Sequence, residues 1–141
     1  MDQNKYEGFY EALVKNVTSY RGKLDEVIFY APNLFKLLTN LLESQRINKA
    51  IRLKISAAIA YFVAPRDVIP EEVYGPLGYI DDIFISSYVL LQVKKMYGWG
   101  LLSENWEGAE PIEKILENIF KKSKEMVKGK EDEILRYVGL K

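Results

Sequence analysis

The sequence predicts an all-α fold, an irregular bundle of five to seven helices with a Pro/Gly-rich loop inside a central helical hairpin. Apolar residues recur at spacings of three and four along most of the chain, which is the period of an amphipathic helix. The alternation that marks a half-buried strand is missing from the sequence. Proline and glycine gather between Pro65 and Tyr79, between the two most apolar segments. The 141 residues fit one compact core, so we expect a single helical domain over residues 1–141.

The first half of the chain predicts four helices. An apolar stripe defines the first, which Gly22 ends, and its members are Tyr6, Phe9, Tyr10, Leu13, Val14, Val17 and Tyr20. A short helix over Leu24 to Ile28 should stop before Pro32, because a residue that precedes proline is pushed out of the helical region. Pro32 suits the first turn of the third helix, which should end near Ser44. The fourth predicted helix runs from about Asn48 to Phe62, with Ile51, Ile55, Ala58, Ile59 and Phe62 inward.

The second half predicts three more helices. Helix resumes over about Asp81 to Met96 and is apolar on nearly every side, which is typical of the central helix of a bundle. Gly98 and Gly100 should end this helix, and a linker is expected from Gly98 to Gly108 and on through Ser103 to Glu110. Pro111 should lie in the first turn of the next helix, and a last short helix over Asp132 to Val138 should be capped by Gly139.

Composition excludes much of ordinary enzyme chemistry. The chain has no cysteine and no histidine, which excludes disulfides, thiolate nucleophiles, imidazole ligands and every catalytic triad with a His base. A metal site would have to use oxygen ligands, which suit Mg²⁺, Mn²⁺ or Ca²⁺. Lys plus Arg and Asp plus Glu number 20 each, so no global field favours nucleic acid, and none is expected as a partner. The polar N-terminal residues do not resemble a secretory signal, and we expect a cytoplasmic location.

One segment stands out by its proline, glycine and aspartate positions. Its characteristic residues are Tyr61, Pro65, Asp67, Pro70, Gly78, Tyr79, Asp81 and Asp82. They resemble the pattern of the YkvA-like family (domain of unknown function 1232): a helix with a Tyr near its end, a Ser-Pro-x-Asp-x-x-Pro loop, and a Leu-Gly-Tyr-x-Asp-Asp segment that opens the next helix. The resemblance covers about residues 50–95 and departs from the pattern at Ala64, Arg66 and Glu71. It implies a helical hairpin around a fixed loop, and no established activity.

The acidic residues of this segment allow two interpretations. Asp67, Asp81 and Asp82, with Glu71 or Glu72, could converge at the mouth of the hairpin and hold a divalent cation. Alternatively, Asp67 stabilises a turn, Asp81 caps the helix that follows, and Asp82 pairs with Arg66 or a nearby lysine. We favour the second interpretation, because acids are common at turns and helix starts.

Two tryptophans frame the expected Gly98 to Gly108 linker. Exposed, Trp99 and Trp106 would form an aromatic anchor for a partner or a membrane surface. Folded back, they would close the core, which we favour because aromatic side chains bury large areas.

These features predict a non-catalytic module that binds an unknown protein partner or associates peripherally with a membrane, with no cofactor. The alternative is a domain that binds Mg²⁺, Mn²⁺ or Ca²⁺, or a metal-dependent hydrolase, with Asp67, Asp81 and Asp82 as ligands.

Overall fold

The structure, a computed structural model, describes residues 4–18, 26–63 and 79–141. Within these ranges the chain forms seven α-helices and one 3-10 helix and no strand, which confirms the predicted all-α irregular bundle. The predicted loop, with Pro65, Asp67, Pro70 and Gly78, lies outside the described residues. The elements are α1 (Asn4–Thr18), η1 (Glu26–Tyr30), α2 (Ala31–Leu42), α3 (Lys49–Val63), α5 (Tyr79–Tyr97), α6 (Trp99–Asn105), α7 (Ile112–Met126) and α8 (Glu131–Tyr137).

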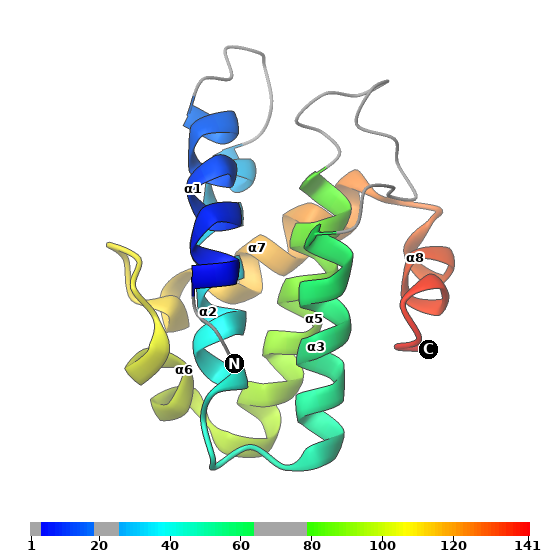
Figure 1. The fold of residues 1–141 in the computed structure, drawn as a ribbon. Helices are drawn as coiled ribbons and strands as arrows, with labels where there is room; N and C mark the ends of the chain where they lie inside the picture. The colour runs from blue at the N-terminus through cyan, green and yellow to red at the C-terminus, as the bar shows by residue number, and fades with distance from the viewer. Residues whose placement is uncertain (1–3, 19–25, 64–78) are drawn as a thin grey trace.

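The helix α5 is the centre of the bundle, as its apolar sequence predicts. Every side chain from Ile80 to Ser87 is buried, and Val89, Leu90 and Val93 continue the buried set. This helix packs against α2, α3, α6, α7 and α8. Figure 1 shows α3 and α5 side by side through the middle of the molecule, with α1 and α2 on one side and α8 on the other. An all-round apolar helix has to be covered on all sides, which explains this position.

Helix starts follow the local chemistry of the sequence. Pro32 lies in the first turn of α2, where its missing N–H costs no hydrogen bond. The side chain of Asn48 caps the N-terminus of α3, since its Oδ1 accepts a hydrogen bond from the N–H of Ile51 at 2.9 Å. The Tyr97 hydroxyl also accepts a hydrogen bond from the N–H of Asn48 at 2.7 Å, which ties the start of α3 to the end of α5.

The segment after α5 differs from the prediction. We expected a linker from Gly98 to Gly108, but residues 99–105 form the short helix α6. Gly98 has a φ of 87° and separates α5 from α6. The physical reason for the helix is burial, because Leu101 and Leu102 are both in the core. Burying a leucine contributes about 1.5–3 kcal/mol, enough to order a short segment with unfavourable glycines.

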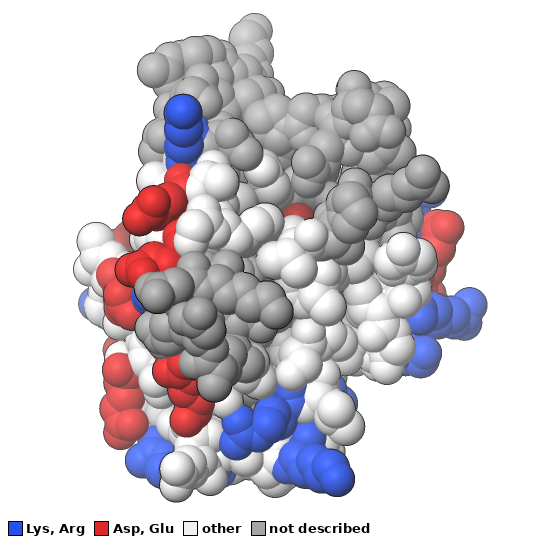
Figure 2. Space-filling model, in the orientation of Figure 1, with Lys and Arg blue, Asp and Glu red and all other residues white. Residues whose placement is uncertain are grey.

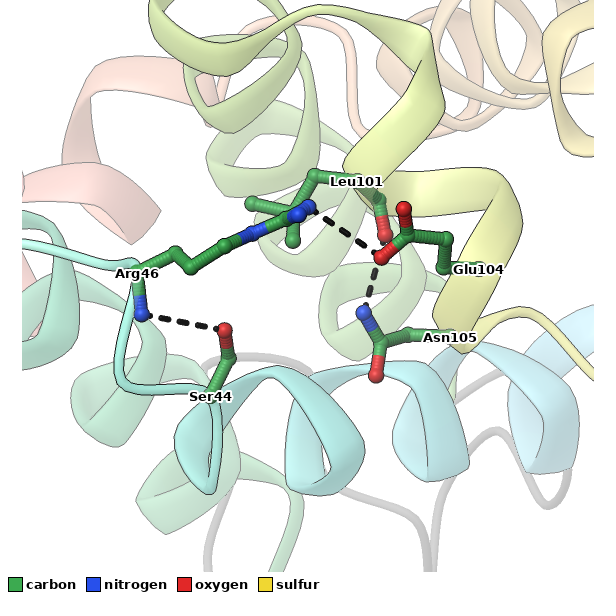
Figure 3. Close-up of polar contacts among 5 residues, drawn as sticks. All are labelled: Ser44, Arg46, Leu101, Glu104 and Asn105. Carbon is green, nitrogen blue, oxygen red and sulfur yellow. Dashed lines mark hydrogen bonds and ion pairs between the residues drawn. The ribbon is translucent and has the colours of Figure 1, made fainter.

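An ion pair connects α6 to the turn after α2, and a side-chain hydrogen bond lies within α6 itself. Figure 3 shows the guanidinium of Arg46 at 3.1 Å from the carboxylate of Glu104, and the amide of Asn105 donating to the carbonyl of Leu101 at 2.9 Å. The Arg46 and Glu104 side chains are mostly exposed, so their ion pair contributes about 0–1 kcal/mol. The burial of Leu101 and Leu102 therefore contributes more to the stability of α6 than this ion pair does.

The C-terminal helix ends as predicted. Gly139 has a φ of 80°, and the N–H of Leu140 donates to the carbonyl of Leu135 at 2.8 Å. This is a glycine C-cap with a Schellman-type hydrogen bond. None of the helices in the described ranges combines the length and apolarity needed to cross a membrane.

Candidate functional site

Four of the eight motif residues lie in the described part of the chain. Tyr61 is near the end of α3, and Tyr79, Asp81 and Asp82 lie in the first turn of α5. Because α5 begins at Tyr79, two residues earlier than predicted, Asp81 is inside the helix rather than at its cap position. The first turn still carries both carboxylates at the positive end of the helix dipole.

A buried hydrogen bond connects the two helices of the hairpin. The hydroxyl of Tyr61 donates to Oδ2 of Asp81 at 2.5 Å, and Oδ1 of Asp81 accepts from the N–H of Asp82 at 3.0 Å. The two aspartates are 0% and 1% exposed. A buried carboxylate is costly unless donors surround it, so the Tyr61 hydroxyl stabilises this arrangement. The geometry gives Asp81 a structural role in joining α3 to α5.

The proposed metal ligands are only partly described. Asp81 and Asp82 are neighbours at the start of α5, whereas Asp67 lies outside the described residues, as do Glu71, Glu72 and Arg66. Within residues 4–18, 26–63 and 79–141, no group of three or more carboxylates is arranged to hold a metal ion. The three-ligand site and the pairing of Asp82 with Arg66 therefore stay predictions.

An apolar groove lies on the outer side of the same hairpin. It has a volume of about 250 Å³ and is lined by Ala57, Ala60, Tyr61, Tyr137 and Val138. The rings of Tyr61 and Tyr137 meet edge to face, with centroids 5.8 Å apart, so the motif tyrosine forms part of the groove wall. Sequence reasoning missed this surface.

The outer face of α3 extends the groove with further apolar side chains. Leu53 is 64% exposed and Val63 is 43% exposed, and across the groove Tyr137 of α8 is 63% exposed. The spacing of Leu53, Ala57 and Ala60 places them on one stripe of the helix, and this was the available sequence signal. Figure 2 shows an uncharged surface over α3, with Lys and Arg side chains gathered at its lower end.

Trp99 packs against the core from the start of α6. Its side chain is half-buried, and the ammonium group of Lys94 lies over its ring at 5.5 Å from the centroid. The favoured interpretation, that this tryptophan folds back onto the core, agrees with its position.

Trp106 also packs against the core, and it forms one wall of a second cavity. Its indole N–H donates to the carbonyl of Glu110 at 2.7 Å, so the ring folds over its own turn. A Cβ on Gly108 would lie 2.3 Å from the indole ring, so only glycine allows this position. The cavity has a volume of about 350 Å³ and is lined by Phe29, Tyr30, Asn33, Trp106, Gly108, Ala109 and Glu110.

Sequence reasoning identified Trp106 and missed its partners. The hydroxyl of Tyr30 donates to the carboxylate of Glu110 at 2.9 Å, across 80 residues of chain. Phe29 is 47% exposed at the rim. Nothing in the local pattern around residue 30 indicates a neighbour near residue 110, because only the packing of α2 and α6 brings them together.

Comparison with known proteins places the hairpin in a family. A family model described as "Protein of unknown function (DUF1232)" matches residues 51–88, which include Tyr61, Asp81 and Asp82. No solved structure matches the chain.

Two kinds of relative are similar to this chain. The "Uncharacterized protein ORF9" of Methanothermobacter thermautotrophicus is 32% identical over 126 residues, which cover 89% of this chain and 86% of that protein. The "E3 ubiquitin-protein ligase RNF170" of Xenopus tropicalis is 43% identical over 47 residues, and that of Danio rerio 40%; in each case the match covers 33% of this chain and 18% of the ligase. The archaeal relative matches this chain over most of both sequences, and the family model matches the central hairpin of this chain. The chain therefore belongs to the DUF1232 family of proteins of unknown function.

Proposed function

We propose that this domain is a non-catalytic interaction module that binds an amphipathic helix of a protein partner along α3 and in the groove between α3 and α8. The exposure of Leu53 and Val63 on α3 and of Tyr137 on α8 is the observation that carries the proposal. Large apolar side chains gathered on one surface are typical of a binding site.

The shape of the surface suits a helix. The groove of about 250 Å³ is smaller than the roughly 300–1,000 Å³ that enclose a small-molecule ligand. It is of a size to take apolar side chains from a partner. The small side chains of Ala57 and Ala60 let a second helix approach α3 closely, and apolar anchors three and four residues apart on the partner would follow the stripe on α3.

Charge indicates which helix would bind. The helix α3 carries Lys49, Arg52 and Lys54 and no carboxylate. Arg52 donates to the carbonyls of Ser44 and Ile47, and Lys54 donates to Gln92 at 2.7 Å, so the cations are held along the helix. Complementary charge accelerates association and selects partners, which favours a helix with acidic residues on its polar side.

The lining of the groove supports binding rather than catalysis. The side chains of the described residues that line it are apolar apart from the hydroxyl groups of Tyr61 and Tyr137. One of these hydroxyls, that of Tyr61, donates to Asp81. A general acid or base must reach a bound substrate, and the carboxylate behind Tyr61 is buried.

A peptide selection tests the proposal. Amphipathic helical peptides displayed on phage are selected on the full chain, and binding of the enriched peptides is mapped by NMR on the isotope-labelled protein. We expect peptides with an acidic polar side and shifts confined to α3 and α8. Leu53→Glu should weaken binding by more than about tenfold, roughly 1.4 kcal/mol. Because Leu53 is 64% exposed, the same change should alter stability by less than about 0.5 kcal/mol.

The matched control is Phe29→Glu, which places the same charge at an exposed apolar residue of η1, away from α3. This variant should bind the selected peptides like the wild type. Equal binding by the wild type and Leu53→Glu, or no enriched peptide, would overturn the proposal. Co-sedimentation with vesicles that contain phosphatidylserine, abolished by Leu53→Glu in the absence of peptide binding, would show instead that the surface docks on a membrane.

The second candidate is the divalent-metal site of Asp67, Asp81 and Asp82, which the adjacent carboxylates of Asp81 and Asp82 favour. A ligand that binds only the native state raises the melting temperature in proportion to the logarithm of its concentration. Millimolar Mg²⁺, Mn²⁺ or Ca²⁺ should therefore raise the melting temperature of the wild type, and Asp67→Asn should abolish the rise. An unchanged melting temperature with all three ions would eliminate this candidate.

A further inference from the structure

We propose that the cavity between η1 and the segment after α6 binds the ammonium group of a lysine side chain, methylated or unmethylated, that a protein partner presents. This site is distinct from the α3 face and goes beyond the function proposed above. It rests on the lining of the cavity by three aromatic side chains and one carboxylate.

The aromatic side chains supply the first part of the recognition. Phe29, Tyr30 and Trp106 line one space of about 350 Å³. The faces of aromatic rings carry partial negative charge, so they attract an alkylammonium group that lies within about 6 Å, and tryptophan attracts it best. The protein already uses this contact internally, where the ammonium groups of Lys36, Lys94 and Lys124 lie 5.5–5.8 Å from ring centroids.

The charge of the cavity supplies the second part. Glu110 is the only charged residue among the described residues that line it. The surrounding sequence from Tyr97 to Glu113 contains four glutamates and neither lysine nor arginine, and of these glutamates Glu104 is paired with Arg46. Figure 2 shows acidic side chains gathered along the side of the molecule where Figure 1 places α6 and the segment after it. A cation therefore meets a complementary field on approach, and an anion is repelled.

The position of Trp106 is set before any ligand binds. Its N–H is held by the carbonyl of Glu110, and the absence of a side chain at Gly108 lets the indole lie on the turn. The Tyr30 hydroxyl donates to the carboxylate of Glu110 at 2.9 Å. A cavity whose walls are already held in place loses little conformational freedom on binding, which favours affinity.

An NMR titration with small probes tests the proposal on the full chain. The probes are the Nα-acetyl methylamides of lysine and trimethyl-lysine, with the methylamide of acetyl-norleucine as the uncharged analogue. We expect saturable shifts of the indole N–H signal of Trp106, with little change at Trp99. The norleucine probe should bind about fivefold or more weakly than trimethyl-lysine, because it lacks the cation.

Paired variants separate local recognition from general electrostatics. Glu110→Gln keeps the shape of the cavity and removes its charge, and it should weaken binding of trimethyl-lysine several-fold. Glu107→Gln removes the same charge from a neighbouring residue outside the lining, whose carboxylate accepts from Asn40 at 2.8 Å, and should leave binding within about twofold. Equal loss in both variants, norleucine binding as tightly as trimethyl-lysine, or an unmoved Trp106 signal would each overturn the proposal.

Discussion

Two hydrogen bonds between a tyrosine and a carboxylate lie in very different surroundings. Tyr61 donates to Asp81 at 2.5 Å, and both side chains are buried between α3 and α5. Tyr30 donates to Glu110 at 2.9 Å at the exposed edge of the cavity beside Trp106. The chemical groups are the same, but only the second pair can be reached from solvent.

Burial decides what each pair can do. A buried acceptor that loses its donor costs about 1–3 kcal/mol, since no water replaces the donor. At the surface water replaces it, and the hydrogen bond contributes less. We therefore assign the Tyr61–Asp81 pair to the stability of the hairpin, and the Tyr30–Glu110 pair to the shape and charge of a binding cavity.

The largest effect is expected for Tyr61→Phe. This change keeps the ring and its contact with Tyr137 but removes the donor from Asp81. Urea denaturation should show a loss of about 1–3 kcal/mol in the free energy of unfolding. A loss below about 0.5 kcal/mol would mean that the hydroxyl is not needed to bury Asp81, and the contrast between the two pairs would fail.

A smaller loss is expected for Gly108→Ala. The new Cβ would meet the half-buried indole of Trp106 and force it off its turn, so we expect a loss of about 1 kcal/mol and a red shift of tryptophan emission. Gly100→Ala is the control, because a Cβ there meets nothing within 4 Å. This control should keep the emission spectrum and be neutral or slightly stabilising. Matching spectra for the two variants would contradict the fixed position of Trp106.

Tyr30→Phe completes the comparison with Tyr61→Phe. Removing this hydroxyl leaves the Glu110 carboxylate in contact with solvent, so we expect a loss below about 0.5 kcal/mol in the same urea experiment. Equal losses in the two variants would show that exposure does not distinguish the pairs.

A third carboxylate extends the comparison to a fully exposed site. The hydrogen bond from the Lys141 ammonium group, together with its positive charge, lowers the pKa of Asp132 below its ordinary value. Lys141→Ala should raise this pKa toward that value in an NMR titration. Lys130→Ala, which removes a cation paired with Glu133 instead, should leave it unchanged.

The sign of the matching pH dependence follows from the lowered pKa. The Lys141 contribution to stability is present above the unfolded pKa of Asp132 and is lost as pH falls through the lower folded value. The Lys141→Ala variant should therefore be less stable than the wild type at neutral pH, and the two stabilities should converge only in acid. A difference that persists unchanged below the folded pKa would contradict the assignment.

Most of the fold was predictable because its causes are local. The three- and four-residue spacing of apolar side chains located the helices. Pro32 marked the start of α2 and Gly139 the end of α8. The all-round apolar character of residues 80–93 identified the central helix. The segment 99–105 was predicted wrongly, because its glycines favour a linker while Leu101 and Leu102 reach a core that the local pattern does not show.

The candidate sites were predictable only in part. The motif residues Tyr61, Asp81 and Asp82 were recognised, but the hydrogen bond between Tyr61 and Asp81 depends on how α3 packs on α5. The cavity depends on residues 80 positions apart, and the α3–α8 groove on a helix that returns to the hairpin from the C-terminus.

By itself the sequence determined the helical class, the central helix, the family motif and the exclusion of cysteine and histidine chemistry, because these follow from residue identity and short-range spacing. The tertiary structure decided which carboxylates are buried and which face a cavity, and which apolar side chains stay uncovered. Burial is a property of neighbours that are distant in the chain, and the same tyrosine and carboxylate serve stability in one place and face solvent in the other for that reason.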